Sequence, residues 1–152
     1  MKLLTNMQAK RLDKIALKKN NTTGQSLMKN AGSCVADHAI SLLQKVQNPE
    51  ILVICGKGNN GGDGFAAASI LKDKNYKVNI HTLTSEEEIS GEGLKYFLEC
   101  KKKDVLISFC LEMQKRLSPD LIIDGLFGTG LSRAISQEII KYIRWINQSN
   151  SK

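Results

Sequence analysis

A short apolar run followed directly by a glycine-rich turn is the feature that most constrains the fold of this 152-residue chain. The run is Ile51-Leu52-Val53-Ile54-Cys55, and the turn is Gly56-Lys57-Gly58-Asn59-Asn60-Gly61-Gly62-Asp63-Gly64. A continuous apolar run is typical of a strand that is buried on both faces of a parallel sheet. We therefore predict a strand over residues 51–55, with the glycine turn at its carboxyl end.

The rest of the chain alternates between helical and strand patterns. The apolar spacing predicts helices over residues 4–19, 25–46, 62–74, 111–117 and 134–147, and strands over residues 77–83, 104–108 and 121–124. Ser85 and Glu88 have the spacing of a capping box, which predicts the start of one more helix ending near residues 101–103. Strands that alternate with helices indicate a single α/β domain, residues 1–152, with a mostly parallel sheet covered on both faces.

Composition excludes several classes of partner. The net charge of +7 comes from scattered lysines, and aromatic residues make up only 5% of the chain. No basic stripe is interleaved with aromatic rings, so we expect no nucleic-acid surface. No stretch approaches the about 20 apolar residues that span a bilayer, and the first residues lack the apolar core of a signal peptide. We expect a cytoplasmic protein that does not contact a membrane.

The first glycine turn is suited to binding an anion. Backbone N–H groups in such a turn point into one concavity, and the following helix adds its positive end. The Gly56-x-Gly58-x-x-Gly61 spacing matches the dinucleotide fingerprint, but the acid expected about 20 positions further on, which would hold a ribose hydroxyl, is absent near His81 and Thr82. A plain dehydrogenase is therefore disfavoured. Asn59, Asn60 and Asp63 also offer oxygen ligands for a hard cation; the alternative is a tight turn that tolerates these residue types.

A second glycine turn follows the strand predicted at residues 121–124. It reads Asp124-Gly125-Leu126-Phe127-Gly128-Thr129-Gly130-Leu131-Ser132-Arg133. A carboxylate at the end of a buried strand is desolvated unless it is paired or binds something. We therefore expect Asp124 to be a metal ligand or a general acid–base, or else a turn cap. Arg133 could pair with a phosphate or form a surface ion pair.

The two turns resemble those of the NAD(P)H-hydrate epimerase family, also known as the YjeF N-terminal domain. The matching segments are residues 58–64, residues 124–131 and, upstream, Leu27-Met28-Lys29-Asn30-Ala31-Gly32. The resemblance implies a Rossmann-like three-layer αβα fold and a homodimer. It also implies an isomerase that interconverts the R and S forms of hydrated NADH and NADPH, working with a fused or separate NAD(P)H-hydrate dehydratase.

The resemblance also implies a site. Asn60 and Asp124 would coordinate a potassium ion, and the substrate would be bound by Asn59, Asn60, Gly61, Gly62, Asp63, Gly128, Thr129, Gly130, Leu131, Ser132, Arg133 and Ala134. Inversion at the hydroxylated carbon requires a proton to move, and a carboxylate near the ring could move it. Asp124 is the first candidate and Asp63 the second.

In the family the pattern continues into one more strand, so we expect the domain to be incomplete at its C-terminal end. That departure leaves two hypotheses open. The first is an epimerase, or its N-terminal part. The second is a non-catalytic nucleotide-binding or protein-interaction module on the same fold.

Overall fold

A four-stranded parallel sheet forms the centre of the protein. The computed structural model describes residues 4–19, 22–109, 118–131 and 134–152. The strands are β1 (Glu50–Cys55), β2 (Lys77–Thr82), β3 (Leu106–Ser108) and β4 (Leu121–Gly125), in the spatial order β3-β2-β1-β4. Every neighbouring pair is parallel, which confirms the predicted α/β class.

Helices connect the strands. They are α1 (Asn6–Lys19), α2 (Gly24–Leu43), α3 (Asn59–Asp73), α4 (Gly91–Lys102) and α5 (Gln137–Gln148), with a 3₁₀ helix η1 (Glu86–Glu88) before α4. Side chains cap helices at their start; for example, Thr23 accepts a hydrogen bond from the N–H of Ser26 at α2, and Ser136 accepts one from Ile139 at α5. Such caps satisfy N–H groups that have no partner inside the helix.

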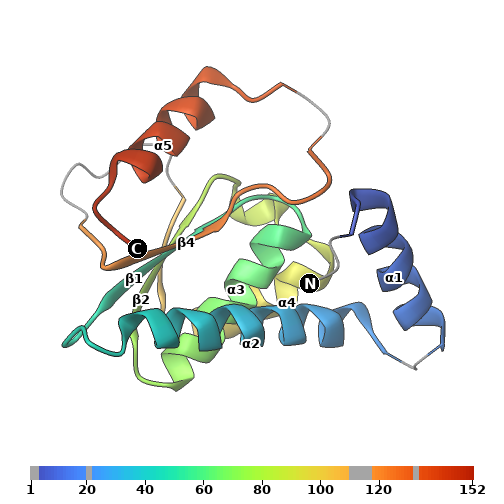
Figure 1. Cartoon of the computed structure of the whole chain (residues 1–152), viewed down its shortest axis with the longest axis horizontal. Coiled ribbons are helices and arrows are strands. Elements are labelled where there is room, and N and C mark those ends of the chain that lie inside the picture. The colour runs from blue at the N-terminus through green and yellow to red at the C-terminus, as the bar shows by residue number, and fades with distance from the viewer. Residues whose placement is uncertain (1–3, 20–21, 110–117, 132–133) are drawn as a thin grey trace.

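Strand β1 separates two apolar clusters. Ile51, Val53 and Cys55 pack in the larger cluster with α2, α3 and α4, whereas Leu52 and Ile54 pack with α5. This alternation follows from the two-residue period of a strand. Figure 1 shows α5 on one side of the sheet and α2, α3 and α4 on the other, so the three-layer αβα arrangement is confirmed.

Three predictions about helices need correction or comment. The helix after the first glycine turn begins at Asn59 rather than at residue 62, so the two asparagines belong to its first turn. The capping box of Ser85 and Glu88 is present, but it opens only the single turn η1, and α4 begins separately at Gly91. The helix predicted over residues 111–117 lies outside the described residues.

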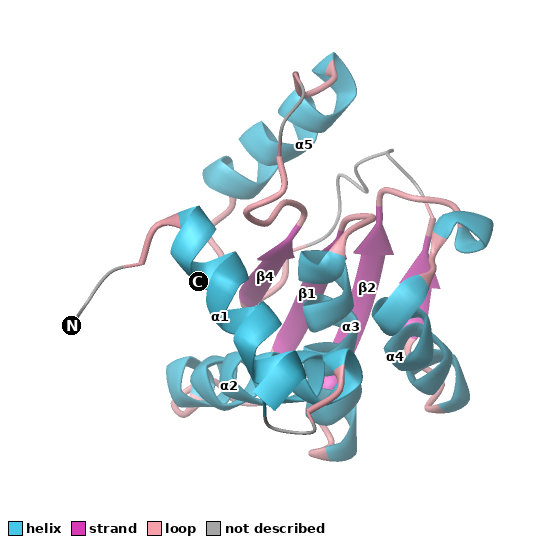
Figure 2. Ribbon diagram, turned by 90° about the vertical axis from the view of Figure 1, so that its right-hand side faces the viewer, coloured by secondary structure: helices cyan, strands magenta, loops and turns pink. Residues whose placement is uncertain are grey.

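Helix α1 is set apart from the sheet, as Figure 1 shows, and Figure 2 views the sheet from the side on which α1 lies. Its large apolar residues lie at the surface, and Met7 is 80% exposed. None of the helices within the described ranges is long and apolar enough to cross a membrane.

The C-terminal end of the chain lies against β4. The N–H of Lys152 donates to the carbonyl of Asp120 over 2.9 Å, and the N–H of Ile122 donates to the carbonyl of Lys152 over 3.0 Å. This is the hydrogen-bond pattern of a parallel pair of strands. Lys152 therefore occupies the side of β4 that faces away from β1.

Candidate functional site

The two glycine turns lie side by side at one edge of the sheet. The chain moves from β1 to β2 and β3 on one side and returns to place β4 on the other side of β1. In open parallel sheets, ligands bind outside the carboxyl ends of the strands where the order reverses in this way. That reversal lies between β1 and β4, the two strands that the glycine turns follow.

Backbone contacts join the turns into one unit. The N–H of Gly56 donates to the carbonyl of Gly125 over 3.1 Å. A Cβ atom at Gly56 would lie 2.0 Å from the carbonyl oxygen of Leu126, a distance that only glycine avoids. The turn after β1 therefore requires glycine because the turn after β4 passes against its backbone.

Asn60 links the turns through its side chain. Its Nδ2 donates a 3.0 Å hydrogen bond to the carbonyl of Phe127. With the nitrogen held there, the amide oxygen Oδ1 is turned away from that carbonyl. A Cβ built on Gly128 would lie 3.8 Å from this oxygen, so the amide also faces the second turn.

The start of α3 presents unpaired backbone donors beside this junction. Gly58 is the N-cap and supplies no side-chain cap, and the first bond inside the helix runs from the N–H of Gly62 to the carbonyl of Gly58. The N–H groups before Gly62 consequently lack helical acceptors. A Cβ at Gly58 would meet nothing within 4 Å, so the space in front of the helix is open. This geometry favours an anion such as a phosphate group.

Asp63 lies one turn along α3 from Asn59 and Asn60. On a helix, residues three and four apart share a face, so Asp63 lies on the same side as the two asparagines. Burial, and to a smaller extent the nearby carboxylate of Asp13 in α1, together raise the pKa of Asp63 to about 6. The Asp63 carboxyl can therefore hold or release a proton close to neutral pH.

Asp124 adopts the turn-cap arrangement, one of the alternatives that the sequence left open. Its side chain is exposed, and its Oδ1 accepts a 2.9 Å hydrogen bond from the N–H of Leu126. Asp124 thus closes the turn that follows β4. It adjoins Gly125, where a Cβ would lie 3.0 Å from the backbone carbonyl oxygen of Asn60.

The remaining predicted residues fall on both turns. Gly61 and Gly62 are buried at the start of α3, and Asn59 is exposed beside them. Gly128, Thr129, Gly130, Leu131 and Ala134 are exposed. Ser132 and Arg133 lie outside the described residues.

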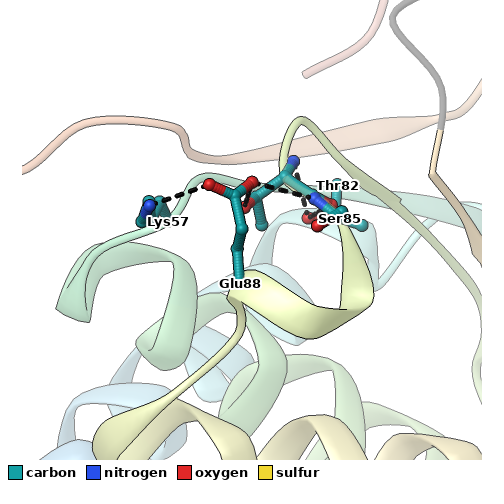
Figure 3. A network of polar contacts seen from close by, with 5 residues as sticks. Lys57, Thr82, Ser85 and Glu88 are labelled. Carbon is teal, nitrogen blue, oxygen red and sulfur yellow. Dashed lines mark hydrogen bonds and ion pairs between the residues drawn. The ribbon is translucent and has the colours of Figure 1, made fainter.

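Sequence reasoning missed a polar network on the β2 side of the first turn (Figure 3). Lys57 Nζ lies 2.8 Å from Glu88 Oε1, while Thr84 Oγ1 donates to Glu88 Oε2 over 2.9 Å. The one available signal was the capping-box spacing of Ser85 and Glu88, which locates Glu88 in a turn but not against Lys57.

Two cavities lie away from the glycine turns. One of about 390 Å³ lies between the end of α4 and β3, and another of about 360 Å³ lies between α2 and β4. Neither is lined by residues 56–64 or 124–131.

Comparison with known proteins agrees with this geometry. A family model described as YjeF-related protein N-terminus matches residues 24–152. The chain is 34% identical over 154 residues to the bifunctional NAD(P)H-hydrate repair enzyme Nnr of Dictyoglomus turgidum, covering 100% of this chain and 30% of that protein. It is 34% identical over 127 residues to the NAD(P)H-hydrate epimerase of Nitrosopumilus maritimus, covering 82% of this chain and 59% of that protein.

Two further matches extend over nearly all of this chain. It is 30% identical over 147 residues to the NAD(P)H-hydrate epimerase of Oenococcus oeni, covering 96% of this chain and 68% of that protein. The crystal structure of yeast ynu0, YNL200c, superposes with a TM-score of 0.79 at 22% identity, covering 95% of this chain and 64% of that one. The structural match supports the fold. The matched residues 24–152 contain both glycine turns, and on that ground the chain belongs to the family of YjeF-related protein N-termini.

Proposed function

We propose that this chain carries the dinucleotide-binding turns of an NAD(P)H-hydrate epimerase, which interconverts the R and S forms of hydrated NADH and NADPH. Relatives named for this activity support the proposal, although the chain spans 30% to 68% of the length of those compared above. The observation that carries it is the hydrogen bond from Asn60 to Phe127, which joins the two turns where the strand order reverses.

The two turns suit two parts of the substrate, the diphosphate and the nicotinamide ring. The open N–H groups at the start of α3 would bind the diphosphate, because they combine free donors with the positive end of a helix. The second turn, at residues 126–131, would lie along the nicotinamide side. The substrate would thus span the junction between β1 and β4.

Inversion requires the hydroxyl on the ring carbon to leave one face and return to the other. A protonated carboxyl donates its proton to the hydroxyl, the C–O bond breaks to release water, and the ring nitrogen stabilises the cation. Water then attacks the opposite face and returns a proton to the carboxylate. Asp63 fits this role because its pKa of about 6 leaves both protonation states available near neutrality.

Asp124 fits a different role in the same site. It is exposed and already accepts a hydrogen bond from Leu126. Its ionised carboxylate would stabilise positive charge on the ring by electrostatic attraction. We therefore assign proton transfer to Asp63 and charge stabilisation to Asp124, which reverses the order predicted from the sequence.

The donor set suits a potassium ion. Asn60 offers a neutral amide oxygen and Asp124 a carboxylate, both hard oxygen ligands. Within the described ranges no group of three or more His, Cys, Asp or Glu side chains could hold a metal ion. Asn60 and Asp124 would hold the potassium ion, which would supply a fixed positive charge at the junction of the two turns.

The proposal is tested by incubating the full chain with an unequal mixture of the two hydrated NADH epimers and following their ratio by chromatography, with and without potassium. We expect the ratio to relax faster than the spontaneous reaction. Asp63→Asn should slow the enzymatic rate by about 10²- to 10⁴-fold, the usual contribution of a general acid–base.

The outcomes separate the two hypotheses. No acceleration by the wild-type chain would contradict the epimerase. Thermal stabilisation by dinucleotides without turnover would instead support a non-catalytic binding module, the alternative considered from the sequence. The homodimer, the dehydratase partner and the cytoplasmic location remain predictions.

A further inference from the structure

A carboxylate from the connection after β2 is placed against the first glycine turn. Lys57 belongs to that turn, and its Nζ lies 2.8 Å from Oε1 of Glu88 in η1. Figure 3 shows the two side chains extending toward one another across the edge of the sheet. The pair therefore connects the carboxyl ends of β1 and β2. In sheets of this class, one half of a dinucleotide binds beside the ends of these two strands.

Glu88 is fixed by more than the lysine. Its Oε2 accepts hydrogen bonds from Thr84 Oγ1 over 2.9 Å and from the N–H of Ser85 over 3.3 Å. The hydrogen bond from Lys57, followed by those from Thr84 and Ser85, lowers the pKa of Glu88 to about 2. Glu88 is consequently a fixed negative charge throughout the physiological pH range.

Both partners remain open to a ligand. The side chains of Lys57 and Glu88 are 61% and 49% exposed. An exposed ion pair contributes little to folding stability on its own. A bound group could therefore join this pair without first displacing a buried contact.

The position of Glu88 corresponds to that of a ribose ligand. In dinucleotide sites of this architecture, an acid near the end of the second strand accepts a hydrogen bond from the 2′-hydroxyl of the adenosine ribose. The strand end itself, at His81 and Thr82, carries no acid. The connection after β2 brings Glu88 back to that edge of the sheet. The carboxylate therefore comes from a residue that lies later in the chain than the end of β2.

The chemistry of the pair distinguishes two forms of ribose. A hydroxyl donates its proton to Glu88 and accepts a hydrogen bond from Lys57, so both partners are satisfied. A 2′-phosphate has no proton to donate at neutral pH, and its charge is repelled by Glu88. Removal of the carboxylate charge would leave Lys57 free to bind the phosphate.

We propose that Lys57 and Glu88 form the adenosine-ribose site of this chain and select the 2′-hydroxyl of the NADH form over the 2′-phosphate of the NADPH form. The inference rests on the proposed function, because it requires a dinucleotide on the glycine turns.

The test measures binding of NADH and NADPH to the full chain by isothermal titration calorimetry. We expect the wild-type chain to bind NADH more tightly. Glu88→Gln keeps the size of the side chain and removes its charge, and should shift the affinity ratio toward NADPH by about tenfold, the size expected for one like-charge contact at a surface. Lys57→Gln should shift the ratio in the opposite direction.

Glu86→Gln is the matched control. Glu86 lies in the same 3₁₀ turn and pairs with Lys101 of α4 at 2.6 Å, away from the glycine turn. It should leave the ratio unchanged. A second measurement on the wild-type chain needs no variant: adenosine 5′-monophosphate should bind more tightly than adenosine 2′,5′-bisphosphate.

The possible results distinguish a failure of the ribose assignment from a failure of the proposed function. If dinucleotides bind but Glu88→Gln behaves like Glu86→Gln, the ribose assignment is wrong and the proposed function is unaffected. Equal or tighter binding of the bisphosphate also overturns the assignment. If the wild-type chain binds neither NADH nor NADPH, the proposed function itself fails, and the ribose assignment fails with it.

Discussion

Asn60, in the first turn of α3, donates a 3.0 Å side-chain hydrogen bond to the backbone carbonyl of Phe127 in the turn after β4. This bond joins parts of the chain that are 67 residues apart and fixes the distance between the two glycine turns. The amide group of one side chain thus holds together the two halves of the candidate site.

Asn60→Ala should therefore weaken both folding and ligand binding. Loss of this part-buried hydrogen bond should lower the free energy of unfolding by about 1 kcal/mol, measured by urea denaturation. Asn59→Ala, at the exposed neighbouring position, should change it by less than about 0.5 kcal/mol. Equal losses in the two variants would show that the bond to Phe127 does not hold the turns together.

Gly56 should be intolerant of a side chain. Gly56→Ala would place a Cβ atom 2.0 Å from the carbonyl oxygen of Leu126, so backbone must move. We expect a loss of about 1–3 kcal/mol or more in the free energy of unfolding. Gly130→Ala, where a Cβ meets nothing within 4 Å, is the control and should be nearly neutral. A stable Gly56→Ala variant with an unchanged dinucleotide affinity would contradict the close approach of the turns.

Asp63 should make folding stability decrease with pH. Its folded pKa of about 6 lies above its ordinary value of 3.8, so between these values the folded chain binds more protons than the unfolded chain. Stability is then lost as pH rises from about 4 to about 6 and stays lower above that range. Asp63→Asn should remove this penalty and stabilise the chain at pH 7 by about 1 kcal/mol, less than the full shift implies because water screens a half-buried carboxyl.

Asp13→Asn tests how much the charge of Asp13 contributes to the raised pKa of Asp63. Burial is the larger cause and the charge of Asp13 the smaller one, so this variant should lower the pKa of Asp63 only in part. Carboxyl NMR titration measures the change directly. An unperturbed Asp63 pKa in the wild-type chain would also remove the argument for proton transfer by this residue.

The contact between His81 and Tyr142 should produce the opposite pH dependence. His81 Nδ1 lies 2.7 Å from the hydroxyl of Tyr142, and burial lowers the pKa of His81 below its ordinary value of 6.5. Below that pH the unfolded chain takes up a proton that the folded chain resists, so stability falls as the solution becomes acidic. His81→Gln should abolish this component in urea titrations at several pH values.

Tyr142→Phe tests the hydrogen bond separately from the charge. The ring stays in the cluster beneath α5, but His81 loses its hydroxyl partner, which should cost about 1–3 kcal/mol. An unchanged free energy of unfolding would mean that packing of the ring alone holds α5 on the sheet.

The local features of the site follow from the sequence, and its long-range contacts do not. The apolar run before Gly56 locates β1 because contiguous residues determine that pattern. The bond from Asn60 to Phe127 depends on the position of β4 beside β1, which no local pattern encodes. The sequence leaves open whether Asp124 caps a turn or binds a ligand, and only the folded chain shows it exposed and bonded to the N–H of Leu126.

Glu88 shows a related limit of sequence reasoning. A search for an acid at a fixed offset from the glycine turn fails at Thr82, because the offset assumes that the carboxylate follows the strand directly. Here the chain first makes a 3₁₀ turn, which brings Glu88 back to the end of β2. The spacing of Ser85 and Glu88 reports that turn, but only the folded chain shows which group the turn approaches.

The central position of β1 has a consequence for how ligands would be detected. This strand contributes to both apolar clusters and leads directly into the first glycine turn, so it cannot loosen without disturbing the whole fold. A molecule that binds the folded turns and not the unfolded chain must then raise the melting temperature of the entire domain. Thermal-shift screening with nucleotides is accordingly a direct route to the natural ligand, even for a compound that undergoes no reaction.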